Sequence, residues 1–519
     1  MSNREIAVSL KNITKSFGQV QANSKVSMDI YKGEILALLG ENGSGKTTLM
    51  NMLSGIYFPD EGQIEINGKE VVIKSPRQAF DLGIGMVHQH FKLIDVFTAA
   101  ENIILGLEGG LNIKDATAKI NEICYKYGFD VNPDQKVYDM SVSQKQTVEI
   151  VKVLFRGADI LILDEPTAVL TPQETEKLFT VLRNMKADGK SIIIITHKMH
   201  EVESISDRVA ILRKGEYIGD MVTKETNAQE MTDMMVGRSV ALNIDRPKPK
   251  GNIKPRIRVE NLTVRNEEGI IKLDDVSFTA KSGEILGIAG ISGCGQKELL
   301  EAIAGLQVAE KGSIVYIDDD DHEEQILGKD PKKISDLGVA LSFVPEDRLG
   351  MGLVGNMDLS DNMLLRSFRD GKLGFIDKKT PKKLAEKVVD ELEVVTPGIN
   401  TPVRRLSGGN VQKVLVGREI ASAPTVLLTA YAVRGLDINS SYTIYDLINK
   451  QKMAGVAVIF VGEDLDVLLE LSDRILVLCG GKVSGIVDGE KADKNQIGMM
   501  MTKLSNNTEY TDNNAEEED

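Results

Sequence analysis

The chain has 519 residues, a net charge of −15 at pH 7 and three cysteines. Because single hydrophobic cores stop growing near roughly 250–300 residues, two or more domains are expected. The acidic balance argues against nonspecific nucleic-acid binding, which needs clustered Lys and Arg. The cysteines are too far apart in the sequence for metal-ligand spacing or a disulfide framework. No apolar run approaches the roughly 20 residues that span a bilayer, and the N-terminus is polar. We therefore expect a cytoplasmic protein whose link to a membrane runs through another subunit.

Short apolar runs alternate with helical stretches along the chain. Four runs in the first half are typical of buried strands: Ile35–Leu39, Ile160–Leu163, Ile192–Ile195 and Val209–Leu212. Such continuous runs favour a parallel sheet that is covered on both faces. Residues from about 91 to 155 have helical character instead. The sequence thus predicts an α/β fold with a parallel or mixed sheet core and an inserted helical subdomain.

The chain also repeats itself. The stretch GEILALLGENGSGKTTL at 33–49 returns as GEILGIAGISGCGQKEL at 283–299, and SDRVAILRKG at 206–215 returns as SDRILVLCGG at 472–481. Because the order is kept, we predict two copies of one domain, at residues 1–240 and 256–504. The proline-containing segment 241–255 is a predicted linker, since proline interrupts helices and central strands. The polar, acidic residues 505–519 are predicted to be a disordered tail.

The first copy carries a phosphate-binding loop. Residues 40–47 fit the pattern G-x-x-x-x-G-K-[ST], with a predicted strand before them and a predicted helix, Thr47–Leu53, after them. The glycines allow successive backbone N–H groups to surround phosphate oxygens, and the helix start adds partial positive charge. Lys46 supplies a full charge to the outer phosphates, and the Thr47 hydroxyl is a candidate ligand for Mg²⁺. The candidate nucleotide-binding residues here are Gly40, Asn42, Gly43, Gly45, Lys46, Thr47 and Thr48.

A second strand supplies two carboxylates. The run Ile160–Leu163 is followed directly by Asp164 and Glu165. Asp164 is placed to hold Mg²⁺, and Glu165 to orient and deprotonate the attacking water. An acidic strand end alone could serve only solubility, but the upstream phosphate loop favours the catalytic interpretation.

These residues resemble the nucleotide-binding domains of ABC transporters, in both copies and over nearly the whole chain. The resemblance implies ATP and Mg²⁺ as cofactors and gives roles to three further residues. Gln89 in MVHQH resembles the Q-loop glutamine, which senses Mg²⁺ and faces the transmembrane subunit; His197 in IIITHKM resembles the switch histidine at the γ-phosphate; Phe17 in KSFGQV resembles the aromatic that stacks on adenine. An ordinary strand-end role for His197 and simple packing for Phe17 remain the alternatives.

The second copy has lost the chemical residues of its site. Its loop keeps Gly290, Gly293 and Gly295, but Gln296 stands at the lysine position and Lys297 at the Ser/Thr position. Ala430 replaces the metal-binding aspartate, and Tyr431 replaces the base, although a phenol is almost fully protonated at pH 7. By the resemblance, Glu463 replaces the switch histidine and Glu346 the Q-loop glutamine. We expect this degenerate site to be nearly silent in hydrolysis.

The signature sequences show the opposite asymmetry. By the resemblance, the first copy should carry an LSGGQ-like motif but has MSVSQ at 140–144, with Ser143 in place of a glycine. The second copy keeps LSGGN, in which Ser407 and the amides of Gly408 and Gly409 can cap a γ-phosphate. Asp437 resembles the D-loop aspartate. In this family, each nucleotide lies between one copy's phosphate loop and the other copy's signature. The resemblance therefore implies one hydrolytic site, completed by Ser407, Gly408 and Gly409, and one degenerate site.

The phrases GMVHQHFKLIDVFTAAENIILG, DEPTAVLTPQE and FVPEDRLGMGL are similar to the energy subunits of bacterial importers for simple sugars and nucleosides, and the nucleoside branch is favoured. This implies two transmembrane permease subunits and an extracytoplasmic solute-binding protein as partners, no nucleic acid, and a peripheral location on the cytoplasmic face of the membrane. Two other classes of protein are alternatives: a tandem ATPase that acts on ribosomes as a translation factor, and a regulatory ATP-binding module without turnover. Intact Glu165 and His197 argue against the module. The eroded second site, the short linker and the negative charge argue against the translation factor.

The acidic run 318–321 is predicted to be a solvated hairpin tip rather than a cation site.

Overall fold

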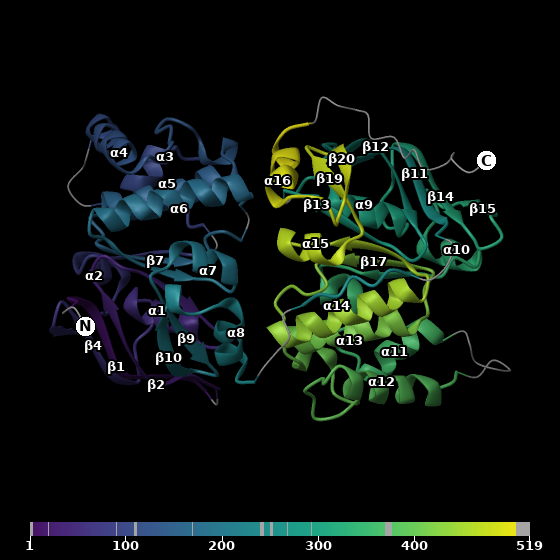
Figure 1. The fold of residues 1–519 in the computed structure, drawn as a ribbon, viewed down its shortest axis with the longest axis horizontal. Coiled ribbons are helices and arrows are strands. Elements are labelled where there is room, and N and C mark those ends of the chain that lie inside the picture. Colours follow the sequence, from purple (N-terminus) through teal and green to yellow (C-terminus); the bar gives the residue numbers. More distant parts are fainter. Residues whose placement is uncertain are drawn as a thin grey trace. The chain divides into compact units, whose positions relative to one another are not determined.

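The computed structural model describes residues 4–18, 20–89, 91–107, 112–168, 170–238, 243–249, 253–266, 268–291, 293–368 and 376–504. The chain divides into two compact units, Met1–Ala241 and Leu242–Asp519 (Figure 1). The predicted tail 505–519 and five residues of the predicted linker lie outside the described residues.

The first unit contains two sheets. A four-stranded antiparallel sheet has the order β2 (Val20–Tyr31), β1 (Ile6–Phe17), β4 (Glu61–Ile66), β5 (Lys69–Val71). A six-stranded sheet has the order β10 (Glu216–Val222), β9 (Arg208–Arg213), β3 (Ile35–Leu39), β8 (Ser191–Ile195), β7 (Ile160–Asp164), β6 (Ile84–Val87). All neighbours in the larger sheet are parallel except β10, which runs antiparallel to β9. The predicted mixed sheet is therefore confirmed.

Eight α-helices are described in the first unit: α1 (Lys46–Leu53), α2 (Pro76–Asp81), α3 (Ala99–Ile104), α4 (Ile113–Tyr127), α5 (Val142–Phe155), α6 (Pro172–Ala187), α7 (Met199–Ile205) and α8 (Ala228–Val236). The stretch predicted as a helical subdomain contains α3, α4 and α5. Helix α1 begins one residue earlier than predicted, at Lys46, because Gly45 already provides its N-terminal cap. No helix in the described ranges has the length and apolar character needed to cross a bilayer.

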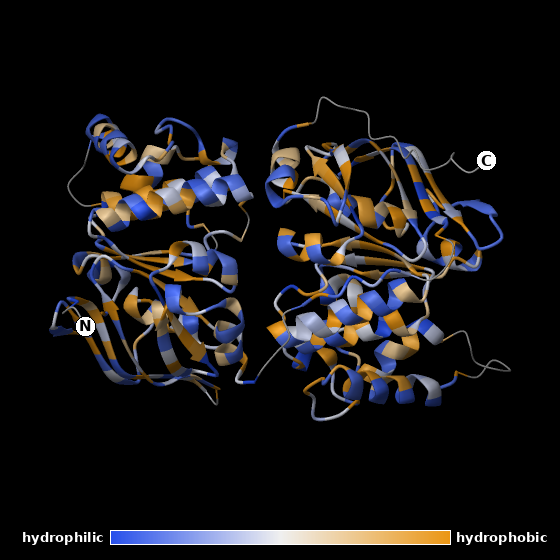
Figure 2. Cartoon of the chain, viewed as in Figure 1, coloured by the Kyte–Doolittle hydropathy of each residue, from blue (hydrophilic) through white to orange (hydrophobic). Residues whose placement is uncertain are grey.

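The two faces of strand β7 show how the layers form. Ile160 and Ile162 pack into a cluster with α1 and the smaller sheet, whereas Leu161 and Leu163 pack into a cluster with α5 and α6. Because successive side chains of a strand point to opposite faces, a continuous apolar run is buried on both sides. Figure 2 shows these strands in the colour of apolar residues between their covering helices. The end of β7, where Asp164 lies, therefore has a fixed position.

The second unit repeats this architecture. Its smaller sheet has the order β12 (Ile271–Lys281), β11 (Pro255–Arg265), β14 (Lys311–Ile317), β15 (Glu323–Gln325). Its larger sheet has the order β16 (Leu341–Val344), β17 (Val426–Ala430), β18 (Ala457–Val461), β13 (Ile285–Gly290), β19 (Arg474–Cys479), β20 (Lys482–Asp488). Its described α-helices are α9 (Gln296–Ile303), α10 (Pro331–Asp336), α11 (Leu359–Ser367), α12 (Lys379–Glu391), α13 (Gly408–Ala421), α14 (Ile438–Met453), α15 (Leu465–Leu471) and α16 (Lys494–Thr502). The acidic run 318–321 lies at the turn between the antiparallel strands β14 and β15, where Asp321 pairs with Lys254.

Candidate nucleotide site and its degenerate copy

The phosphate loop of the first unit connects the end of β3 to the start of α1. Gly45 has φ 97°, a left-handed conformation that glycine adopts without strain. A Cβ at this residue would lie 2.3 Å from the carbonyl oxygen of Ala22, and one at Gly40 would lie 2.3 Å from that of Leu212. The glycines of the motif are therefore required by the fold of the loop itself, which leaves its N–H groups available for an anion at the start of α1.

Lys46 lies over this loop. Its Nζ donates to the carbonyl oxygens of Gly40 at 2.6 Å and Glu41 at 2.9 Å. Burial lowers the pKa of Lys46 to about 8, although Glu165, Asp164 and Glu41 oppose the shift. The side chain is thus held where phosphate oxygens would replace carbonyl oxygens as its partners.

Two predicted metal ligands lie next to each other. The Thr47 hydroxyl donates to Asp164 Oδ2 at 3.2 Å, which joins the first turn of α1 to the end of β7. Burial raises the pKa of Asp164, and the hydrogen bond from Thr47 opposes this rise. Hydroxyl and carboxylate oxygens are hard donors of the kind that Mg²⁺ prefers. The pair therefore fits the predicted cation.

Glu165 is the centre of a three-residue cluster. Gln89 Nε2 donates to Glu165 Oε2 at 3.0 Å, and His197 Nδ1 lies 3.2 Å from Glu165 Oε1. The interaction with His197 lowers the pKa of Glu165, so the carboxylate is ionised at neutral pH, as a general base requires. Glu165 itself has φ 47°, a left-handed conformation that is uncommon for a residue with a Cβ. The structure thus brings together the three side chains predicted to be catalytic.

Phe17 lies at the end of β1 and is 44% exposed. Its ring meets that of Tyr57 edge to face, with centroids 5.2 Å apart, and the Tyr57 side chain was not among the predicted site residues. The two rings form a partly exposed aromatic surface, which suits stacking on a base better than core packing. A comparison of the two copies could have pointed to Tyr57, because the second copy has Gln307 at the corresponding position.

The degenerate loop keeps the backbone of the first. Gly293 and Gly295 have φ 85° and 99°, close to the 79° and 97° of Gly43 and Gly45. Gln296 Nε2 donates to the Ile291 carbonyl oxygen at 3.2 Å and so takes over one of the contacts that Lys46 makes in the first copy. Ser292, within this loop, lies outside the described residues.

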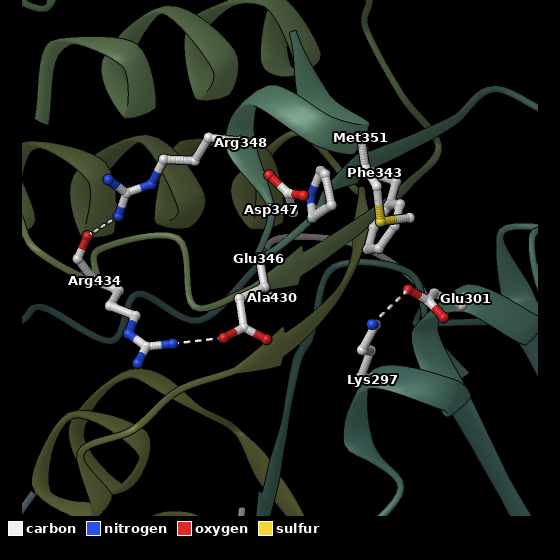
Figure 3. Close-up of a pocket in the computed structure, with 10 residues that line it drawn as sticks. Lys297, Glu301, Phe343, Glu346, Asp347, Arg348, Met351, Ala430 and Arg434 are labelled. Atoms are coloured by element: carbon white, nitrogen blue, oxygen red, sulfur yellow. Dashed lines mark hydrogen bonds and ion pairs between the residues drawn. The ribbon is translucent and has the colours of Figure 1, made fainter. Parts of the chain in front are cut away.

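An arginine occupies the centre of the degenerate site. Arg434 contacts Glu346 Oε1 at 2.5 Å and Glu463 Oε1 at 3.0 Å, so it joins the two residues that replace the Q-loop glutamine and the switch histidine. Ala430 and Arg434 line one cavity of about 390 Å³ together with Lys297 and Glu346 (Figure 3). Burial raises the pKa of Tyr431 to about 12, which keeps the phenol protonated and unable to act as a base at neutral pH. The sequence predicts the replacements but not the position of Arg434 between Glu346 and Glu463.

The two signature segments begin helices α5 and α13. Ser141 caps α5 in a reciprocal capping box with Gln144. Ser407 caps α13, and its Oγ accepts from Asn410 Nδ2 at 2.9 Å. A Cβ at Gly409 would meet its nearest neighbour, Leu436, at an ordinary 3.4 Å. Nothing inside the second unit therefore requires a glycine at this position. Asp437, which resembles the D-loop aspartate, caps α14 by accepting from Ser440 N at 2.8 Å.

A phosphate loop between a strand and a helix of this two-sheet fold, with the acidic end of β7 beside it, defines a P-loop ATPase. The ABC transporter family profile matches residues 23–168 and 273–429, and the chain belongs to this family, with two ATPase copies in tandem. The chain is 41% identical to the Nucleoside import ATP-binding protein NupA of Lactococcus lactis subsp. cremoris, over 96% of this chain and 98% of that protein. It is also 41% identical to the Guanosine import ATP-binding protein NupO of Bacillus subtilis, over 96% and 97%. The resemblance stated from the motifs is confirmed.

A solved structure of an archaeal ribosome recycling factor in complex with a ribosomal stalk protein covers 90% of this chain and 87% of that chain, with a TM-score of 0.58 and 16% identity. At this identity the likeness shows the fold alone.

Proposed function

We propose that this chain is the ATP-hydrolysing subunit of a nucleoside importer and that hydrolysis takes place in the first copy. The observation that carries the proposal is the cluster in which Gln89 and His197 both contact the ionised Glu165 beside an intact phosphate loop. The nucleoside branch is supported by the import proteins of Lactococcus lactis and Bacillus subtilis, each matched along almost its whole length.

Binding of ATP is the task of the loop and of Lys46. The β- and γ-phosphates would replace the Gly40 and Glu41 carbonyl oxygens as partners of the ammonium, while the N–H groups at the start of α1 receive the remaining oxygens. Phe17 and Tyr57 offer their rings to the adenine. Thr47 and Asp164 would hold Mg²⁺, which neutralises phosphate charge when it is bound.

Cleavage depends on Glu165. An ionised carboxylate can orient a water molecule and accept its proton as the oxygen attacks the γ-phosphorus. Gln89 restrains one oxygen of this carboxylate and His197 restrains the other, so the base has a fixed direction. By the family resemblance, His197, which is half-exposed, would also contact the γ-phosphate. The same positions in the second copy hold Tyr431, Glu346 and Glu463, and the Tyr431 phenol at the base position stays protonated at neutral pH.

The signature of the second copy is proposed to complete the first site. Ser407, Gly408 and Gly409 stand at the start of a 14-residue helix, and the exposed Ser407 and Gly408 are accessible to an anion. Gly409 has no structural need to be glycine within its own unit, which is the expected situation where a ligand must approach the backbone closely. The first copy offers Val142 and Ser143 at these positions instead.

The partners are proposed from the same relationship. An import ATP-binding subunit needs membrane permeases, and we infer two of them together with an extracytoplasmic solute-binding protein. The chain would then be peripheral, on the cytoplasmic face of the membrane.

The test is reconstitution. The full chain, with its permease subunits and solute-binding protein, is placed in proteoliposomes, and phosphate release is measured with inosine, guanosine or ribose as solute. We expect a nucleoside to stimulate hydrolysis and ribose to leave it unchanged, and Lys46→Ala to abolish the stimulated rate. Stimulation by ribose alone would overturn the nucleoside assignment. Sedimentation with ribosomes, and not with membranes, would overturn the transport function.

A further inference from the structure

Arg348 makes a bridge inside the second unit. It begins the π-helical turn Arg348–Gly352 that follows Glu346. Its Nη1 donates to the carbonyl oxygen of Gly408 at 3.1 Å, and its Nη2 donates to the carbonyl oxygen of Arg434. Figure 3 shows this second contact beside the ion pair between Arg434 and Glu346. The guanidinium thus connects the first turn of the signature helix α13 to the loop after β17.

The fit around Arg348 is close on both sides. A Cβ at Gly408 would lie 3.1 Å from Arg348 Nη1, and one at Gly435 would lie 3.6 Å from Nη2. The planar guanidinium therefore lies against the backbone of two glycines. A planar group with two parallel donors suits two carbonyl oxygens better than a flexible ammonium does. The half-buried position and the neighbouring Arg434 both disfavour the charge, which shows in the lowered pKa of Arg348.

Arg434, at the other end of this bridge, is also fixed in position. Its carbonyl oxygen accepts from Arg348, and its side chain forms ion pairs with Glu346 and Glu463. These two arginines belong to the second copy alone. By alignment of β6 with β16 and of β7 with β17, Phe91 and Ala168 stand at the corresponding places of the first copy.

We propose that Arg348 is a positioning residue for ATP hydrolysis: it fixes the first turn of α13 so that Ser407, Gly408 and Gly409 present their donors to the γ-phosphate in the first site. This inference rests on the proposed completion of the first site by the second copy's signature. Glu346 and Glu463, which replace the catalytic residues in the second copy, thus help to hold the signature segment in place through Arg434 and Arg348. Arg348 also adds positive charge next to a helix start, where an anion is expected to bind.

The test uses the full chain. Arg348→Ala should lower kcat for ATP hydrolysis about tenfold, the size expected for one lost charge-assisted hydrogen bond, with a circular dichroism spectrum and thermal midpoint close to wild type. Binding of ATP, measured in a Glu165→Gln background, should change less than twofold. Arg348→Lys keeps the charge, but its side chain is one atom shorter and has no planar fork, so it cannot reach both carbonyls and should also lose activity. Wild-type kcat in Arg348→Lys would overturn the proposal even if Arg348→Ala failed to fold.

A double-mutant cycle separates positioning from general stability. In a Ser407→Ala background, Arg348→Ala should have little further effect, because both changes act through one turn. An unchanged tenfold loss in that background would contradict the proposal. The matched control is Arg258→Ala, which removes an arginine of β11 paired with Glu323, and which should leave kcat unchanged.

The Lys46→Ala variant distinguishes the two levels of inference. If Lys46→Ala retains hydrolysis, the proposed function itself fails. If Lys46→Ala is inactive but Arg348→Ala keeps wild-type kcat, only the positioning role of Arg348 fails.

Discussion

The two copies of the domain share a scaffold and differ in their chemistry. In the first, Arg208 binds Glu34 at 2.9 Å; in the second, Arg474 binds Glu284 at 2.8 Å. The buried Asn102 and Asn362 each accept a backbone N–H eight residues earlier in the chain, from Ile94 and Val354. These polar residues serve the fold, and both copies keep them. Fold and catalysis are therefore carried by separate residues within one domain.

The difference between the copies is concentrated where the strands end, and it amounts to an inversion of charge. In the first copy a carboxylate, Glu165, is flanked by an amide and an imidazole. In the second a guanidinium, Arg434, is flanked by two carboxylates. In the second copy both carboxylates are engaged by the Arg434 guanidinium, and neither stands at the base position, where the Tyr431 phenol lies instead. The second arrangement is a stable cluster without a catalytic base.

The strongest test of this comparison substitutes the residue at the base position of each copy. Glu165→Gln should lower kcat by about 10²–10⁴-fold, because the general base is lost, while ATP binding is retained. Tyr431→Phe, at the corresponding position of the second copy, should leave kcat within twofold of wild type. Phosphate release and filter binding with labelled ATP measure the two quantities. Substantial residual hydrolysis in Glu165→Gln would show that the base lies elsewhere.

The protonation of Lys46 gives a second distinction. Since its pKa is near 8, the nucleotide-free protein loses this positive charge as the pH rises above 8, and ATP binding must then take up a proton. The Kd for ATP should increase about tenfold for each pH unit well above the pKa. Calorimetry in buffers of different ionisation enthalpy detects the proton. Lys46→Arg, which stays charged over this range, should abolish the pH dependence; a pH-independent Kd in the wild type would contradict the assignment.

The aromatic surface gives a smaller effect. Phe17→Ala should weaken ATP binding about tenfold, within the range found for aromatic stacking on a base, while Phe17→Trp should bind almost as the wild type does. Gln307→Ala, the counterpart of Tyr57 in the second copy, is the control and should not alter the Kd. Equal binding of ATP and a base-free triphosphate by the wild type would show that the rings contribute nothing.

The smallest predicted effect concerns stability. Gln146 donates to the Pro166 carbonyl oxygen at 2.5 Å, whereas neither end of the buried amide of its counterpart Gln412 has a hydrogen-bond partner among the described residues. Gln412→Met should therefore raise the free energy of unfolding by about 1 kcal/mol, and Gln146→Met should lower it by a similar amount. Differential scanning calorimetry of the full chain measures both. A loss of stability in Gln412→Met would show that its amide is satisfied in solution.

The phosphate loop and the acidic strand end of the first copy can be predicted from the sequence because their parts are local, whereas no local pattern marks Tyr57 beside Phe17. A phosphate loop is a short pattern between a strand and a helix, and Asp164 and Glu165 follow an unmistakable buried strand. The cluster around Arg434 could not be found this way, because Glu346 and Glu463 come from distant segments and only the sheet order brings them together. Arg348 resembles any surface arginine until the fold places Gly408 and Gly435 beside it. The antiparallel smaller sheets were also missed, since their strands are interrupted by bulges and do not form continuous apolar runs.

The second copy shares one unusual backbone conformation with the first. Tyr431 has φ 54°, almost the same left-handed turn as the 47° of Glu165, and a residue with a Cβ is strained there by about 1–3 kcal/mol. The degenerate site of the second copy therefore keeps this backbone conformation although its chemical side chains differ. Restoring the chemistry of the first copy would need new side chains at Gln296, Lys297, Glu346, Ala430, Tyr431 and Glu463, on a backbone that already has the left-handed turns at Gly293, Gly295 and Tyr431.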